Sequence, residues 1–130
     1  MTAKELSQLY YLNREIEQDE RRLAELEAAA TRSTTRAAGL PHMRGFADKT
    51  ALAAEIADIR TMIEANQKLC VAKYNQLMRF IMDVDDSLMR QILKLRHVNG
   101  LNWRQVARSI GGNNTEDSVR MAHKRFLDEK

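Results

Sequence analysis

The sequence has 130 residues, of which 30% are charged and 5% aromatic, and its formal net charge is +3. This composition disfavours one large globular core and favours long charged helices joined to a small packed domain. The sequence contains no apolar run that could cross a bilayer and no secretory signal pattern, and its single cysteine, Cys70, excludes an internal disulfide bond. We therefore expect a cytoplasmic protein without a membrane anchor.

The first predicted element is a helix from Ala3 to about Ala30, because helix-forming residues dominate this stretch and it lacks glycine and proline. Apolar residues recur along it at steps of three and four, and Asp19 occupies one position of the same seam. The other seam positions are Leu9, Leu12, Ile16, Leu23, Leu26 and Ala30. A seam of this length requires a partner helix.

The second predicted element is a loop over residues 31–50, where serine and threonine are followed by Gly39, Pro41 and Gly45. A second helix is expected from Asp48 to about Met82, again with an apolar stripe. Its members are Leu52, Ile56, Ile59, Ile63, Cys70, Tyr74, Leu77 and Ile81. Residues 1–83 are thus expected to form a coiled-coil-like helical hairpin that mediates oligomerisation, closed either within one chain or between two.

Residues 84–130 are expected to form a separate head of three short helices, after a boundary marked by Asp83, Asp85 and Asp86. The first head helix would be capped by Ser87 and end at Asn99–Gly100, with Leu88, Ile92 and Leu95 on its apolar face. The fold class predicted for the whole chain is therefore all-α.

The other two head helices have the pattern of a helix-turn-helix. Trp103, Val106, Ala107 and Ile110 share one face of the first, and Gly111–Gly112 should end it in left-handed conformations. Thr115 can cap the next helix, which carries Val119, Ala122 and Phe126 on its inner face. The second of the two would be the recognition helix.

The charge of the head indicates a nucleic-acid partner. Between Ser87 and Leu127 eight cationic side chains face only two carboxylates, Glu116 and Asp117. We expect Arg120 and Lys124 to reach base edges, and Arg104 and Arg108 to lie along phosphates. The predicted DNA-binding residues are Arg104, Arg108, Thr115, Asp117, Arg120, Met121, Lys124 and Arg125.

A family resemblance is carried by the run from Leu88 to Ala107, Leu-Met-Arg-Gln-Ile-Leu-Lys-Leu-Arg-His-Val-Asn-Gly-Leu-Asn-Trp-Arg-Gln-Val-Ala. It resembles the DNA-binding region four of bacterial sigma factors, and the layout of the whole chain is similar to that of small phage and prophage regulators of late transcription. The arrangement of Trp103, Gly112, Thr115, Val119–Arg120 and Arg125–Leu127 is also similar to the Myb-type DNA-binding repeat. Both resemblances imply a helix-turn-helix that binds double-stranded DNA.

The function expected from the sequence is that of a sequence-specific transcription regulator at the nucleoid of a bacterial host cell. It would act as a homo-oligomer, with a dimer favoured, and RNA polymerase is a further candidate partner. Two alternatives stay open: a DNA-packaging subunit similar to the small terminase, which forms a ring, and a protein-interaction module that does not bind DNA. We expect neither an enzyme nor a metal or other cofactor, because no catalytic or ligand spacing is present.

Overall fold

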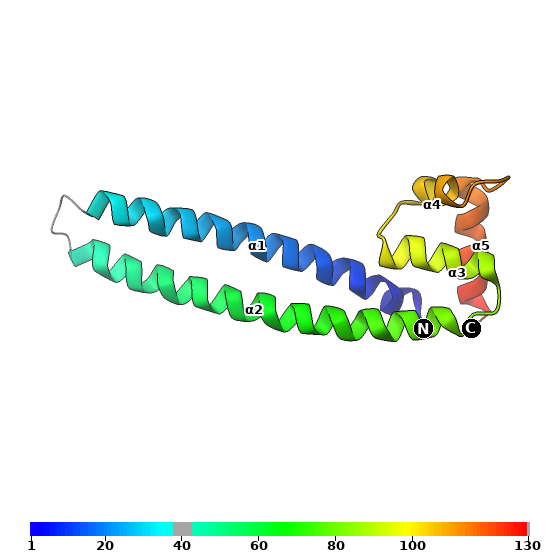
Figure 1. Ribbon diagram of the computed structural model, residues 1–130, viewed down its shortest axis with the longest axis horizontal. Helices are drawn as coiled ribbons and strands as arrows, with labels where there is room; N and C mark the ends of the chain where they lie inside the picture. The colour runs from blue at the N-terminus through cyan, green and yellow to red at the C-terminus, as the bar shows by residue number, and fades with distance from the viewer. Residues whose placement is uncertain (38–42, 130) are drawn as a thin grey trace. The chain divides into compact units, whose positions relative to one another are not determined.

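The computed structural model describes residues 1–37 and 43–129, and the side chains of residues 33–37 and 43–48 are left aside. The described part is built from helices and contains no strand, which confirms the all-α class. None of the described helices is both long and apolar enough to span a membrane. The elements are α1 (Ala3–Ala37), α2 (Met43–Met82), α3 (Ser87–Leu93), the π-helix η1 (Lys94–Val98), α4 (Trp103–Ile110) and α5 (Glu116–Asp128) (Figure 1).

The chain divides into two compact units, and this division differs from the boundary expected after residue 83. One unit is Asn13–Leu69, and the other joins Met1–Leu12 to Cys70–Lys130. The head therefore includes the beginning of α1 and the end of α2. This division could not be predicted from the sequence, because α1 and α2 continue through both unit boundaries without a break in their apolar pattern.

The unit Asn13–Leu69 consists of two antiparallel helical stretches that lie side by side (Figure 1). Leu26 of α1 and Ile63 of α2 are buried in it. Two ion pairs connect the helices: Arg22 with Glu55 at 3.2 Å and Arg60 with Glu27 at 2.7 Å. Leu23, Ile56 and Ile59 are only partly buried, so the apolar stripes of this unit are partly covered.

The predicted loop over residues 31–50 is wrong for the most part. α1 continues to Ala37 and α2 already begins at Met43, so Asp48 lies inside a helix; residues 38–42 are outside the described residues. The serine and threonine residues after Thr31 lower helix propensity by only a few tenths of a kcal/mol each. A helix that is already formed can propagate through them, because the costly step is nucleation.

The second unit has a core to which both ends of the chain contribute. Its fully buried side chains are Leu6 of α1, Ile92 and Leu93 of the α3–η1 segment, Val106 of α4 and Val119 of α5. Leu77 and Ile81 of α2 belong to the same cluster, whereas Tyr74, expected in that stripe, is exposed. In Figure 1, α5 runs across α3 and α4, and it packs against both.

The first head helix differs from its predicted register. Met89 is buried and Leu88 is exposed, so the inner face is Met89, Ile92 and Leu93, while Leu95 is partly buried. Asp86, rather than Ser87, is the cap, since its carboxylate accepts from the Leu88 N–H at 3.1 Å. The chain then widens into η1, which is closed by a bond from the Asn99 N–H to the Lys94 carbonyl.

Asp19 interrupts the seam of α1, as its position in the sequence predicts, and its Oδ2 atom is buried without a hydrogen-bond partner. Because an unsatisfied buried acceptor costs free energy, Asp19→Leu should raise the free energy of unfolding by about 1 to 2 kcal/mol. Urea denaturation followed by circular dichroism measures this gain. Asp58→Leu, the same change at an exposed position of α2, is the control, and an equal effect in both variants would contradict the assignment.

Candidate nucleic-acid interface

α4 and α5 each begin with a capping box, which fixes where the two helices start. Asn102 accepts from the Gln105 N–H, and the Gln105 side chain accepts from the Asn102 N–H in return. Thr115 and Ser118 form the same reciprocal pair at the start of α5. The predicted cap at Thr115 is therefore confirmed, and the N-terminal ends of both helices are held in place.

The connection between α4 and α5 depends on two glycines with positive φ, 75° at Gly111 and 65° at Gly112. Gly111 has a ψ of −157°, so it is not in the left-handed helical conformation that the sequence predicted. That extended region at positive φ is accessible almost only to glycine. The Asn114 amide closes the turn by donating to the Gly111 carbonyl at 2.9 Å.

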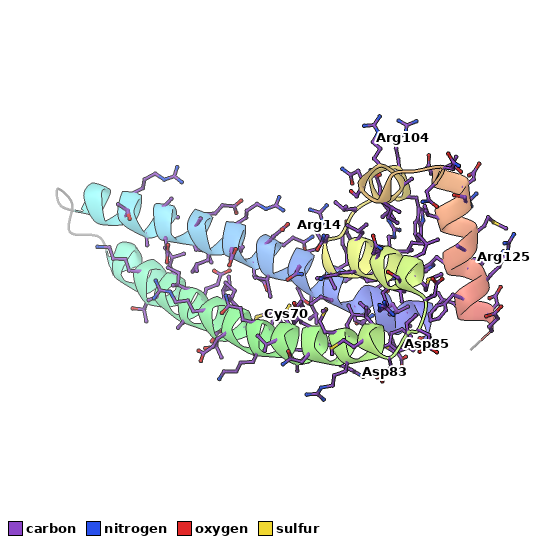
Figure 2. All side chains as sticks on the ribbon, turned by 45° about the vertical axis from the view of Figure 1, so that its right-hand side comes forward. Arg14, Cys70, Asp83, Asp85, Arg104 and Arg125 are labelled. Atoms are coloured by element: carbon purple, nitrogen blue, oxygen red, sulfur yellow. The ribbon has the colours of Figure 1, made fainter. Side chains whose placement is uncertain are left out.

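The predicted phosphate and base contacts lie on the outer surfaces of these helices. Arg104 and Arg108 are exposed one turn apart on α4, while Val106 and Ala107 are buried on its inner face. On α5, Arg120, Met121 and Lys124 are exposed opposite the buried Val119. Figure 2 shows Arg104 pointing away from the rest of the head.

Asp117 lies next to Arg120 and forms an ion pair with it at 3.1 Å. Both groups are largely exposed, so the pair orients the guanidinium more than it stabilises the fold. Glu116 and Asp117 also occupy the first turn of α5, where carboxylates offset the positive end of the helix. A phosphate at Thr115 would meet both carboxylates, so this part of the expected interface stays a prediction.

Arg125 is separated from the other cations of α5. It borders a groove of about 460 Å³ together with four carboxylates, those of Asp83, Asp85, Asp86 and Glu129. In Figure 2 its side chain projects from α5 well away from Arg104. These carboxylates reduce the positive field that Arg125 can offer to a phosphate.

A cluster that the sequence did not predict lies behind this surface, and we call Arg96, His97, Trp103 and His123 the histidine cluster. His97 and His123 are buried, and their Nε2 atoms are 2.9 Å apart. The Trp103 ring is 4.9 Å from that of His123, between ring centroids, and the Arg96 guanidinium lies 4.5 Å from the centre of Trp103. The cluster therefore connects η1, α4 and α5.

The winding of η1 explains how His97 enters this cluster. A π-helix uses more residues for each turn, so the chain rotates less per residue than in an α-helix. His97, which α-helical winding would carry away from Ile92 and Met89, thus returns to the inner face. The histidine pair joins residues 26 positions apart in the sequence.

Both imidazoles are held in the neutral form. Burial lowers the pKa of His97 to about 4, with further lowering by His123 and by the Arg96 guanidinium. Burial and then Arg96 lower the pKa of His123. In the neutral pair one Nε2–H donates to the other Nε2, which satisfies both buried nitrogens.

Among the described residues no group of three potential metal ligands is present. Comparison with known proteins finds no matching family model, no match among curated proteins and no matching solved structure.

Proposed function

We propose that this protein is a sequence-specific regulator of transcription that binds double-stranded DNA through α4 and α5 as a helix-turn-helix. The observation that supports this most directly is the pair of capped helices joined by the Gly111–Gly112 turn, with exposed arginines on the outer side of each. A helix that is packed on its inner face and cationic on its outer face can enter the major groove. The excess of cations in the head supplies the attraction to phosphate.

The individual side chains would divide this task. Arg120 presents two donors to a guanine, with Asp117 holding its guanidinium in position, and Lys124 reaches a neighbouring base. Met121 offers an apolar contact to a thymine methyl group. Arg104 and Arg108 of α4 bind the backbone phosphates and set the register.

The biological setting follows from the layout of the whole chain, which is similar to that of small phage and prophage regulators of late transcription. It implies a phage or prophage regulator that acts at the bacterial nucleoid, with RNA polymerase as a further partner. We propose that the protein acts as a dimer, because helix-turn-helix regulators commonly bind operators whose two-fold symmetry matches that of a dimer. Exposed Val71, Tyr74 and Met82 on one side of α2 provide an apolar surface for a second copy.

Two substitutions separate base contacts from phosphate contacts. Arg120→Ala should weaken binding to the preferred site by about 1 to 2 kcal/mol and binding to random DNA much less, because it removes a base contact. Arg104→Ala should weaken binding to both DNAs and lower the slope of log affinity against log salt by about one unit. The preferred site comes from a genomic-fragment selection with the purified protein, followed by titrations at several salt concentrations.

Arg79→Ala is the matched control, since Arg79 is exposed on α2 outside the proposed interface. Equal losses on both DNAs for Arg120→Ala and Arg104→Ala would contradict the assignment of α5 as the recognition helix. A wild-type protein that does not bind DNA at low salt would instead support a protein-interaction module. Sedimentation gives the assembly size, and a ring of about eight copies or more would favour DNA packaging over transcription.

A further inference from the structure

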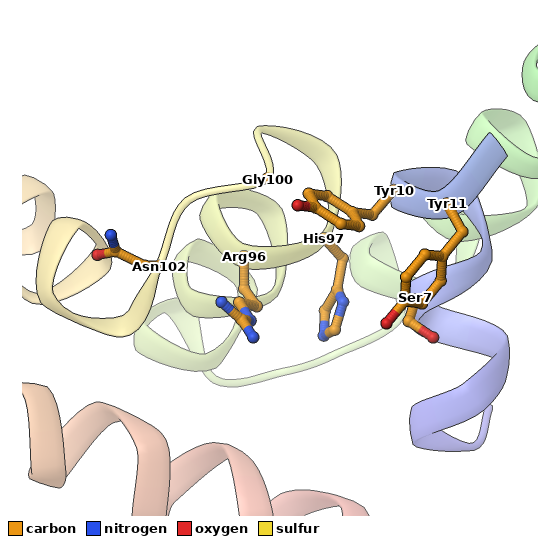
Figure 3. Close-up of a pocket in the computed structure, with 7 residues that line it drawn as sticks. All are labelled: Ser7, Tyr10, Tyr11, Arg96, His97, Gly100 and Asn102. Carbon is orange, nitrogen blue, oxygen red and sulfur yellow. The ribbon is translucent and has the colours of Figure 1, made fainter. Parts of the chain in front are cut away.

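A cavity in the head lies between the beginning of α1 and the segment from η1 to α4. Its volume is about 360 Å³, within the range of roughly 300 to 1,000 Å³ that small-molecule sites occupy. Its lining residues come from two distant parts of the chain (Figure 3). They are Ser7, Tyr10, Tyr11, Arg96, His97 and Asn102, with the backbone of Gly100.

One wall of this cavity is aromatic. The rings of Tyr10 and Tyr11 are 5.4 Å apart at their centroids and nearly perpendicular, at 80°. The Tyr10 ring packs closely on Gly100, where an added Cβ would lie 3.3 Å from Tyr10 Cδ2. Tyr11 has 61% of its surface exposed, so a flat ligand could cover a large apolar area there.

The opposite wall is cationic. Arg96 Nη1 donates to the Leu101 carbonyl at 2.9 Å and the guanidinium lies over Trp103, so the charge is held in a fixed position by neutral groups. None of the described residues that line the cavity is a carboxylate. The nearby imidazoles of His97 and His123 cannot compensate the charge. A partly buried guanidinium in this setting gains most from an anion.

We infer that this cavity binds a small planar aromatic anion, with the carboxylate at Arg96 and the ring against Tyr10 and Tyr11. Figure 3 shows Ser7, Tyr10 and Tyr11 on α1, and Arg96, His97, Gly100 and Asn102 on the segment from η1 to the start of α4. The hydroxyl of Ser7 and the amide of Asn102 can hydrogen-bond polar substituents on the ring. Because Arg96 contacts Trp103 and Asn102 caps α4, an occupied cavity changes the surroundings of α4 directly.

Benzoate is the simplest probe of this class, and it can be titrated into the full-length protein without DNA. We expect saturable shifts of the amide signals of Gly100 and Asn102 and of the Trp103 indole, with a dissociation constant on the order of 1 mM. Cyclohexanecarboxylate keeps the charge without the aromatic ring, and benzyl alcohol keeps the ring without the charge. Both compounds should have a dissociation constant at least about fivefold higher than that of benzoate.

Tyr11→Ala should weaken benzoate binding about fivefold or more, and its exposed position leaves the fold intact. Tyr74→Ala, an exposed tyrosine of α2 outside the cavity, should bind as the wild type does. Arg96→Gln should lose binding, whereas Arg96→Lys should retain part of it because the charge remains. Absence of saturable benzoate binding, equal binding of the three compounds, or an unchanged affinity of Tyr11→Ala would overturn the inference. None of these outcomes bears on DNA binding.

Discussion

Replacing Ile92 with alanine should lower the free energy of unfolding of the head by about 3 to 5 kcal/mol, because the side chain is fully buried at the contact of α3 with its neighbours. The loss has two parts: the favourable free energy of burying the removed carbon atoms is gone, and the cavity that they leave has a further cost. Urea denaturation followed by Trp103 fluorescence measures it, since Trp103 packs within the same unit. This loss is a large share of the stability of a small domain.

Two neighbouring residues test the register of α3 in the same experiment. Met89→Ala should cost about 2 to 4 kcal/mol, whereas Leu88→Ala should cost less than about 1 kcal/mol, because Leu88 is exposed. The apolar spacing of the sequence predicts the opposite order, with Leu88 inside. A larger loss for Leu88→Ala than for Met89→Ala would therefore contradict the observed register.

Acidification should destabilise the head through the histidine cluster. The pKa of His97 in the folded protein is about 4, below its ordinary value of 6.5, so the unfolded chain binds more protons between these values. The contribution of His97 to the free energy of unfolding is thus fully present above pH 6.5, and it is lost as the pH falls toward 4. Between pH 7.5 and 4.5 His97 alone should cost about 2 to 3 kcal/mol, and the lowered pKa of His123 acts in the same direction.

Denaturation curves at several pH values measure this dependence, and the double variant His97→Gln/His123→Gln provides the reference. The variant keeps polar side chains at both positions but cannot bind a proton in this range. Its stability should change much less between pH 7.5 and 4.5, leaving only the contribution of the carboxylates. Parallel curves for the wild type and the variant would show that the histidine pair does not cause the effect.

Local patterns of the sequence were sufficient to predict most of the helices. The seams at Leu26 and Ile63, the cap at Thr115 and the buried Val106 and Val119 follow from helical period and capping chemistry. The loop over residues 31–50 was overestimated because weak propensities do not stop a helix that is already growing. The buried Leu6 could not be assigned to the head, because its partners lie far along the chain.

The candidate interface was predictable only where it depends on helical period. Arg104, Arg108, Arg120 and Lys124 are exposed as expected, because each lies opposite a buried apolar residue of its own helix. The histidine cluster was missed because it joins η1 to α5, and helical period relates only residues of the same helix. The position of Arg125 beside carboxylates was missed because Asp83 and Asp85 lie in the connection between α2 and α3, far from α5 in the sequence.

The division of the head between both ends of the chain affects how the protein folds. Met1–Leu12 and Cys70–Lys130 form one unit, while Asn13–Leu69 is inserted between them. Joining the two segments would carry the entropic cost of closing a long loop if the insertion were a flexible coil. Its antiparallel helices use mainly local contacts and can form early, which shortens the effective loop and lowers that cost. We expect the isolated segment 84–130 to be poorly stable, since Leu6, Leu77 and Ile81 would be missing from its core.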